Sequence, residues 1–140
     1  MGYTTKSKHT KLDYQQMKSW YCHVGGRHMC LFCDLSKNSV VENELCYMIY
    51  DKFPAAPGHA LIIPKRHVET VFEMNDQEWA AAGALIKTAK SEIEMLYSPV
   101  GYNIKVNCGK AAGQEIMHAH FHLIPKYQKQ KGNKNEEKEN

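Results

Sequence analysis

Three histidines alternate with apolar residues near the end of the chain, as His118, His120 and His122. Side chains of a β-strand point alternately to its two faces, so we expect the imidazoles to share one face and the apolar residues between them to share the other. Histidine has the ordinary pKa nearest neutrality, and three on one face indicate metal ligation, phosphate binding, proton transfer or nucleophilic attack. The alternative is a solvated sheet face with histidines by chance, which Gly113 and Pro125 disfavour because they bound a short element.

Two cysteines form a second group, Cys30-Leu31-Phe32-Cys33. The pair could be a redox couple, half of a zinc site, or two ordinary structural cysteines. The βαβ context of a thioredoxin-like redox motif is missing around it. Two thiolates at this spacing can form one side of a tetrahedral zinc site whose other ligands are nitrogen or sulfur, and the chain has eight histidines. The spacing therefore favours zinc over the other two interpretations.

Five short strands and one long helix would position these groups. The helix is predicted to begin after Asn75, which forms a reciprocal capping box with Glu78. Apolar residues at helical spacing follow, namely Trp79, Ala82, Leu85, Ile86, Ala89, Ile93 and Leu96. Strands are predicted at 39–41, 45–50, 59–64, 102–107 and 117–124, with a helical turn within 67–74. Strands on both sides of one long helix indicate an α+β domain with a mostly antiparallel sheet.

Length and composition limit the class of protein. The 140 residues carry a net charge of +3 and are 43% hydrophobic, which is typical of a globular domain and gives no reason to expect a nucleic-acid partner. No apolar run could span a bilayer and the polar N-terminus has no signal-peptide core, so we expect a cytoplasmic protein with no membrane partner. The five cysteines are odd in number and are expected to be mostly reduced.

Composition also divides the chain into three parts. Residues 1–27 are polar with scattered aromatic side chains, and we expect an N-terminal arm or docking helix. Residues 28–127 carry the periodic patterns and form the predicted domain. The tail, 128–140, contains no apolar side chain of any size and is expected to be disordered.

The segment 118–124, with three histidines separated and followed by hydrophobic residues, resembles the signature of the histidine triad (HIT) superfamily. Other motifs follow that family's order through the body of the chain. They are Cys30-Leu31-Phe32-Cys33, Tyr50-Asp51, Pro57-Gly58-His59, Ile63-Pro64-Lys65-Arg66-His67, Asn107, Gly113-Gln114 and Leu123-Ile124-Pro125. The resemblance implies a HIT-like fold, in which a five-stranded, mostly antiparallel sheet is accompanied by one long helix and short helical segments.

The same resemblance implies a catalytic set. The middle histidine of the triad attacks the α-phosphate of a nucleotide in this family, which makes His120 the expected nucleophile, and a neutral imidazole is chemically suited to that role. His122 resembles the residue that contacts the phosphate and the leaving group, and His118 completes the triad. His59 resembles a histidine that hydrogen-bonds behind the triad and would help to fix the tautomer of the nucleophile.

Substrate contacts are implied for three further residues. Gln114 resembles the partner of His122 at the phosphate and the leaving-group bridge. Asn107 matches a position near the ribose and the phosphates. Asp51 matches the acidic residue that holds the ribose hydroxyls at the end of the second strand.

Zinc-containing bacterial members of the family, and distant uridylyltransferase relatives, imply a metal site. Their C-x-x-C pair is joined by a histidine that ends the third-strand motif and by the first histidine of the triad, which are His67 and His118 in this chain. With Cys30 and Cys33 these residues give a closed Cys2His2 set for a structural Zn²⁺, with no open coordination position. The metal would brace the strand that presents His120 and would not activate water.

One residue departs from the family pattern. The position after Gln114 usually holds Ser or Thr, whose hydroxyl can donate to the phosphate, and this chain has Glu115. A carboxylate beside a bound polyphosphate is repulsive unless it points outward. We expect the outward orientation.

The resemblance thus implies a nucleotide hydrolase or nucleotidyl transferase. Its substrate would be a dinucleoside polyphosphate or a nucleoside phosphoramidate, with a purine base, and its intermediate a nucleotidyl group on His120. A homodimer through the long helix and the fourth strand is also implied. One alternative is a nucleotide-binding module with little turnover that recruits a partner. Another, a metalloenzyme with the triad as zinc ligands, fits poorly because alternate strand residues are awkwardly spaced around one ion and Cys30 and Cys33 would have no role.

Overall fold

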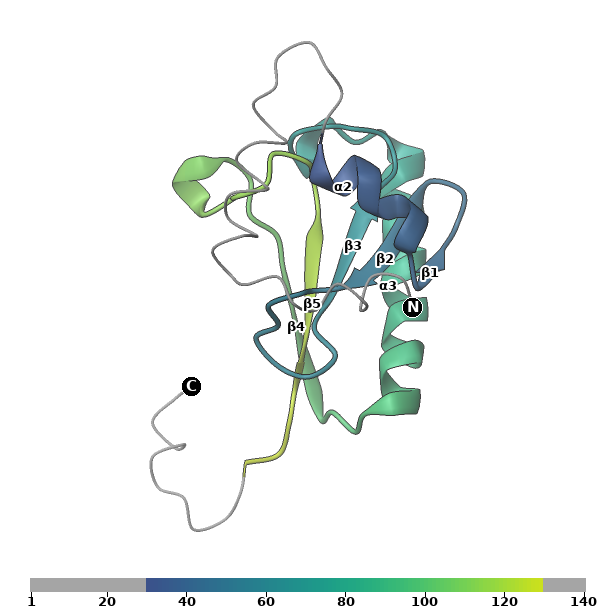
Figure 1. Ribbon diagram of the computed structural model, residues 1–140, viewed down its shortest axis with the longest axis vertical. Helices are drawn as coiled ribbons and strands as arrows, with labels where there is room; N and C mark the ends of the chain where they lie inside the picture. The colour runs from purple at the N-terminus through teal and green to yellow at the C-terminus, as the bar shows by residue number, and fades with distance from the viewer. Residues whose placement is uncertain (1–29, 130–140) are drawn as a thin grey trace.

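The computed structural model describes residues 30–129 (Figure 1). The predicted arm, 1–27, and the tail beyond residue 129 lie outside the described residues. The elements are α2 (Leu31–Asp34), η2 (Leu35–Asn38), β1 (Val41–Glu42), β2 (Cys46–Tyr50), β3 (Ala60–Pro64), η3 (Val71–Glu73), α3 (Asp76–Leu96), β4 (Gly101–Lys105), η4 (Lys110–Ala112) and β5 (Phe121–Lys126).

The strands form one five-stranded sheet in the order β1-β2-β3-β5-β4, and every neighbouring pair is antiparallel. This confirms the predicted α+β class and strand count. The last strand begins later than predicted and continues through Pro125, which pairs with Tyr102. Pro125 lies beyond the part of β5 that pairs with β3. Proline has no N–H to donate, and the sheet tolerates it here because β5 has a neighbouring strand on one side only.

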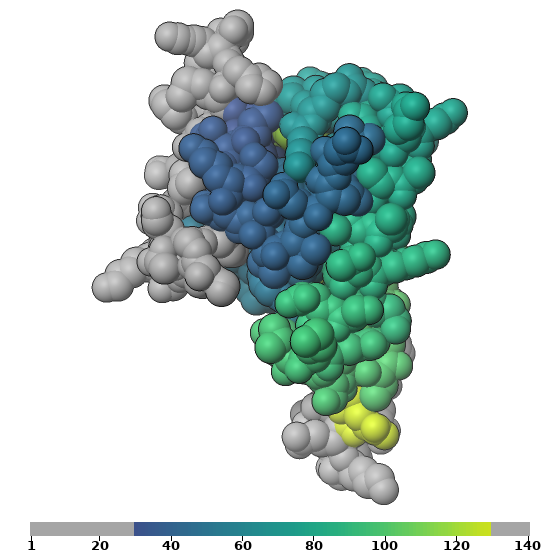
Figure 2. Space-filling view, turned by 90° about the vertical axis from the view of Figure 1, so that its right-hand side faces the viewer, coloured from purple at the N-terminus to yellow at the C-terminus, as the bar shows by residue number. Residues whose placement is uncertain are grey.

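Both faces of the central strands β2 and β3 are buried. In β2, Cys46 and Met48 point into the core that α3 covers, whereas Tyr47 and Ile49 point into the core that α2 covers. The sequence of this strand is therefore a continuous apolar run and not an alternation of apolar and polar residues. Figure 2 shows the blue segment that begins with α2 lying beside the teal and green surface to which α3 contributes.

The long helix begins as the sequence predicts. The Asn75 side chain accepts a hydrogen bond from the Glu78 N–H, and the Glu78 carboxylate accepts one from the Asn75 N–H. Arg66 donates two further hydrogen bonds to Glu78, both 2.9 Å long. The buried stripe is shorter than predicted, because Trp79 is 41% exposed and Leu96 is 63% exposed. Within 30–129 no helix has the length and apolar character needed to cross a bilayer.

Candidate active site

The triad histidines lie on the side of the sheet that α2 covers, and they divide between two sites. The apolar residues that alternate with them are buried in the core beneath α3, as the alternation predicts. Those residues are Ala119, Phe121 and Leu123. His122 lies in β5 opposite Leu61, while His118 and His120 precede the strand. His118 turns toward the two cysteines, and His120 and His122 turn toward a cavity.

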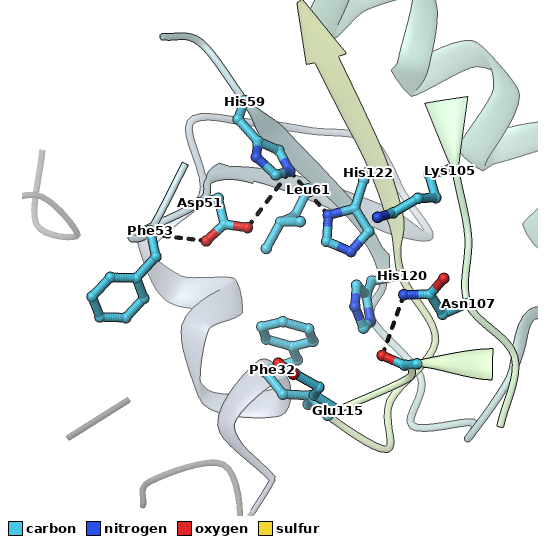
Figure 3. A pocket seen from close by; sticks show the side chains of 12 residues that line it. Phe32, Asp51, Phe53, His59, Leu61, Lys105, Asn107, Glu115, His120 and His122 are labelled. Carbon is cyan, nitrogen blue, oxygen red and sulfur yellow. Dashed lines mark hydrogen bonds and ion pairs between the residues drawn. The ribbon is translucent and has the colours of Figure 1, made fainter. Parts of the chain in front are cut away.

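This cavity has a volume of about 350 Å³, which lies within the range of small-molecule sites (Figure 3). Five of the residues expected at the site line it, and they come from three parts of the chain. They are Asp51, His59, Asn107, His120 and His122. The fold therefore gathers most of the predicted catalytic and substrate-binding residues around one hollow.

The tautomer of His120 follows from its hydrogen bond. Nδ1 lies 2.7 Å from the backbone oxygen of His118, which can only accept, so Nδ1 carries the proton. In the neutral form of the ring the lone pair is then on Nε2. Because His120 is itself largely buried, its ring is held in place and not free to rotate into solvent.

His59 and His122 form a second chain of hydrogen bonds. The Ala55 N–H donates to Nδ1 of His59 over 3.0 Å, so the proton of His59 is on Nε2. This Nε2–H donates to Nδ1 of His122 over 2.9 Å, which leaves the proton of His122 on Nε2. The expectation that His59 fixes the tautomer of His120 was wrong, because the histidine it orients is His122.

Both of these histidines are held neutral. Burial, then the neighbouring rings of His120 and His59, and then Lys105 lower the pKa of His122 to about 3. Burial also lowers the pKa of His59, against the opposing effect of Asp51. The 3.6 Å contact between Asp51 and Nε2 of His59 is therefore one between a carboxylate and a neutral ring. His122 consequently offers a fixed N–H donor without a full charge.

The loops around the cavity hold the other predicted residues. Asp51 follows β2 directly and accepts a hydrogen bond from the Phe53 N–H over 3.0 Å. Asn107 donates to the Gly113 carbonyl over 3.3 Å, and Gly113 has a φ of +97°, which favours glycine.

The structure places Gln114 outside the cavity lining. Its amide nitrogen donates to the carbonyls of Glu69 and Ile116, and its oxygen accepts from the Gly109 N–H. The side chain is 3% exposed, and backbone groups engage both of its polar atoms. In this geometry Gln114 holds the loop together and does not reach toward a phosphate. Glu115 is exposed but also lines the cavity, so its side chain lies at the rim and does not point wholly outward as expected.

Two cysteines and two histidines form a cluster apart from the cavity lining. Nδ1 of His118 is 3.4 Å from Sγ of Cys30, 3.6 Å from Sγ of Cys33 and 3.1 Å from Nδ1 of His67. Nε2 of His118 lies 2.8 Å from the Pro64 carbonyl, so Nε2 carries the proton and Nδ1 presents a lone pair to the cluster. The sequence-predicted ligands thus converge as a group that could hold a metal ion, with donor atoms within 4.8 Å of one another.

Asp51, His59 and His122 also lie close enough to hold an ion. The hydrogen bond between the two imidazoles, however, uses Nε2 of His59 and Nδ1 of His122, the atoms that face each other. This second group is better described as a hydrogen-bonded relay.

Several cavity residues were not predicted from the sequence. Phe32 is buried in α2, and its ring meets the ring of His120 edge-on with centroids 5.0 Å apart. Lys105 reaches the cavity from β4, and Phe53 lines it from the loop after β2. For Lys105 a signal existed, because Asn103, Lys105 and Asn107 are polar at every second position of the predicted fourth strand.

Comparison with known proteins agrees with this fold. The HIT domain family matches residues 34–129, and the chain belongs to that family. An uncharacterised HIT-like protein of Mycoplasma genitalium is 37% identical over 108 residues, which is 74% of this chain and 77% of the relative. A Schizosaccharomyces pombe protein named adenosine 5'-monophosphoramidase is 35% identical over 102 residues, 69% of this chain and 74% of its own length.

A solved structure of a similar protein has the same fold. The crystal structure of a hypothetical histidine triad nucleotide-binding protein from Sulfolobus tokodaii is 32% identical and superposes with a TM-score of 0.67. The match covers 72% of this chain and 71% of that protein. The five-stranded antiparallel sheet with one long helix is therefore the HIT fold.

Proposed function

We propose that the protein is a nucleotide hydrolase or nucleotidyl transferase in which His120 forms a covalent nucleotidyl intermediate. The observation that carries this proposal is the pair of fixed tautomers at the cavity. Nε2 of His120 has the lone pair needed for attack, and Nε2 of His122 has the proton needed to bind an oxygen. The name of the S. pombe relative supports adenosine phosphoramidates as one substrate class.

The first step forms a bond between Nε2 of His120 and the α-phosphorus. The bond from phosphorus to the leaving group breaks, and its electron pair stays on the leaving oxygen or nitrogen. The ring becomes a phosphoryl-imidazolium whose Nδ1–H still donates to the His118 carbonyl, and a hydrogen bond from a charged donor is stronger than one from a neutral donor. Water then attacks phosphorus, the P–N bond breaks, and the neutral ring returns with release of the nucleotide and a proton.

Substrate binding is assigned to the residues that line the cavity. Asp51 would accept from the ribose hydroxyls, and Asn107 would contact the ribose or the phosphates. The N–H of His122 would donate to a phosphate or bridging oxygen, and the loop that Gln114 holds would support these contacts indirectly.

The Cys/His cluster fits a structural zinc ion. Zinc bonds of about 2.3 Å to sulfur and about 2.0–2.1 Å to nitrogen, arranged tetrahedrally, put two nitrogens about 3.3 Å apart and nitrogen and sulfur about 3.6 Å apart. The measured separations are 3.1 Å for the two nitrogens and 3.4–3.6 Å for nitrogen and sulfur. Cys30, Cys33, His67 and His118 would hold the ion, whose role would be to stabilise the fold.

A homodimer through β4 and α3 is consistent with the exposed surface. β4 is the last strand of the sheet order, so its outer edge has no partner strand within 30–129. Ile104 is 60% exposed on this strand, and Val100 just before it is 67% exposed. An unpaired edge with apolar side chains favours association with another chain.

The function is tested by incubating the purified protein with adenosine 5'-phosphoramidate or diadenosine tetraphosphate and following the products by chromatography. We expect release of AMP from at least one of the two substrates. Nucleotide binding without any product would instead support the binding-module alternative.

A further inference from the structure

Lys105 is the one cationic side chain among the residues that line the cavity within 30–129. It ends β4, and the antiparallel register places it opposite His122 of β5. Side chains of directly opposed residues point to the same face of a sheet, and Figure 3 shows the Lys105 amino group beside the His122 ring. The strand pairing therefore fixes a positive charge at one side of the site.

This charge is available to a ligand. Lys105 is exposed, and none of the ion pairs formed within the described range involves it. The anionic residues of the lining are Asp51 and Glu115, and Asp51 lies on the opposite side of His122 from Lys105 (Figure 3). The carboxylates of Asp51 and Glu115 disfavour an anionic group on their own sides of the cavity, and Lys105 favours one beside it.

The neighbouring relay cannot supply that charge. The hydrogen bonds of His59 and His122 require both rings to be neutral, so His122 presents one N–H and no cation. A dinucleoside polyphosphate has a leaving group that is itself a polyphosphate. When the P–O bond to the α-phosphorus breaks, the electron pair stays on the bridging oxygen and the leaving group gains negative charge. An amine leaving group instead takes a proton from solvent and departs uncharged.

We propose that Lys105 is a specificity-determining residue that selects nucleotide substrates whose leaving group bears phosphate over those whose leaving group is an uncharged amine. The inference rests on the proposed nucleophilic role of His120. It adds that dinucleoside polyphosphates are the better substrates of this chain.

The test compares kcat/KM for diadenosine tetraphosphate and adenosine 5'-phosphoramidate in the parent protein and in Lys105→Met. A hydrogen bond between charged groups contributes enough to predict a loss of about 10-fold to 100-fold for the polyphosphate. The phosphoramidate should change by less than about threefold, and Lys105→Arg should retain the polyphosphate rate. Lys110→Met is the matched control, because Lys110 is exposed on the nearby η4 and does not line the cavity.

Selectivity that decreases as salt is added supports the proposal, since salt screens exposed charges. The proposal would be overturned if Lys105→Met lost activity equally on both substrates or on neither. It would also be overturned if the parent protein cleaved only the phosphoramidate. If the parent protein cleaves neither substrate, the proposed function fails, and the role of Lys105 is then tested by measuring nucleotide binding. In that case Lys105→Met should weaken ATP binding about tenfold and AMP binding by less than about threefold, and equal changes would refute the inference.

Discussion

Phe32 lies between the two cysteines of the Cys/His cluster in sequence and against His120 in space. Its ring is 1% exposed and meets the rings of both His118 and His120 edge-on, with centroids 6.0 and 5.0 Å away. The short helix α2, with its N-cap Cys30, thus carries two expected metal ligands, Cys30 and Cys33, and a ring that packs against the expected nucleophile. The cluster and the cavity are joined by this side chain.

Replacing Phe32 with leucine is expected to lower kcat/KM per folded molecule by about 2-fold to 10-fold, because an edge-to-face pair contributes roughly 0.5–1.5 kcal/mol beyond its buried area. Steady-state kinetics on the variant check this. Leu31→Ala is the control, since Leu31 is buried in the same core but does not line the cavity. It should lower the melting temperature and leave kcat/KM nearly unchanged. The same kinetic loss in both variants would show that Phe32 acts only through general stability.

The metal prediction concerns Cys30. Purified protein should contain about one zinc ion per chain, and Cys30→Ser should lose it together with at least about 3 kcal/mol of unfolding free energy at saturating zinc. Elemental analysis and chemical denaturation measure the two quantities. Cys108→Ser is the control, because Cys108 is a free cysteine outside the cluster. Metal-free protein after careful purification, or a native disulfide between Cys30 and Cys33, would contradict the assignment.

The lowered pKa of His122 predicts a pH dependence of stability. A histidine whose pKa is lower in the folded than in the unfolded state releases protons on folding, so its contribution favours the folded state above about pH 6.5. The contribution is lost progressively as the pH falls from about 6.5 toward the folded value of about 3. His122→Gln should flatten the fall of unfolding free energy between pH 6.5 and 4.5, measured by urea titration at constant zinc. Parallel curves for the two proteins would show that His122 is not held neutral.

Glu115 is expected to slow the reaction of highly charged substrates slightly. Its exposed carboxylate lies at the rim of the cavity, where a charge contact is worth up to roughly 1 kcal/mol. Glu115→Gln should therefore raise kcat/KM for diadenosine tetraphosphate by up to about fivefold, with a gain that shrinks as salt is added. A gain that does not respond to salt, or no gain at all, would mean that the carboxylate points away from the phosphates.

Local rules predicted much of the fold. The capping box of Asn75 and Glu78 placed the start of α3, and the alternation at 118–122 placed the histidines and the apolar residues on opposite faces. The helix α2 was not predicted, because four residues cannot show a helical period and its Cys30 N-cap makes no side-chain hydrogen bond. Burial of Leu31 and Phe32 against the sheet stabilises it, which only the tertiary structure reveals.

Most of the residues named from the sequence lie around one cavity, but the hydrogen bonds between them differ from the predicted ones. The family motifs indicated His59 but not its hydrogen-bond partner. That partner depends on how the loop after β2 is placed, and in the structure it is His122. The sequence position of Gln114 predicted a contact with the phosphate. In the structure its side-chain amide forms hydrogen bonds with nearby backbone groups instead. The alternation of Asn103, Lys105 and Asn107 indicates a polar face of β4, but it does not place Lys105 in the cavity, because that position comes from the register between β4 and β5.

The most direct measurement for the central claim is to trap the intermediate. Protein mixed with substrate and quenched in alkali, where a phosphorus–nitrogen bond to imidazole survives, should gain the mass of one nucleotidyl group, and peptide mapping should locate it on His120. His120→Ala should show no label, keep most of its nucleotide affinity and lose about 10²-fold to 10⁴-fold in turnover. A label on another residue, or turnover of His120→Ala within a few-fold of the parent, would contradict the mechanism.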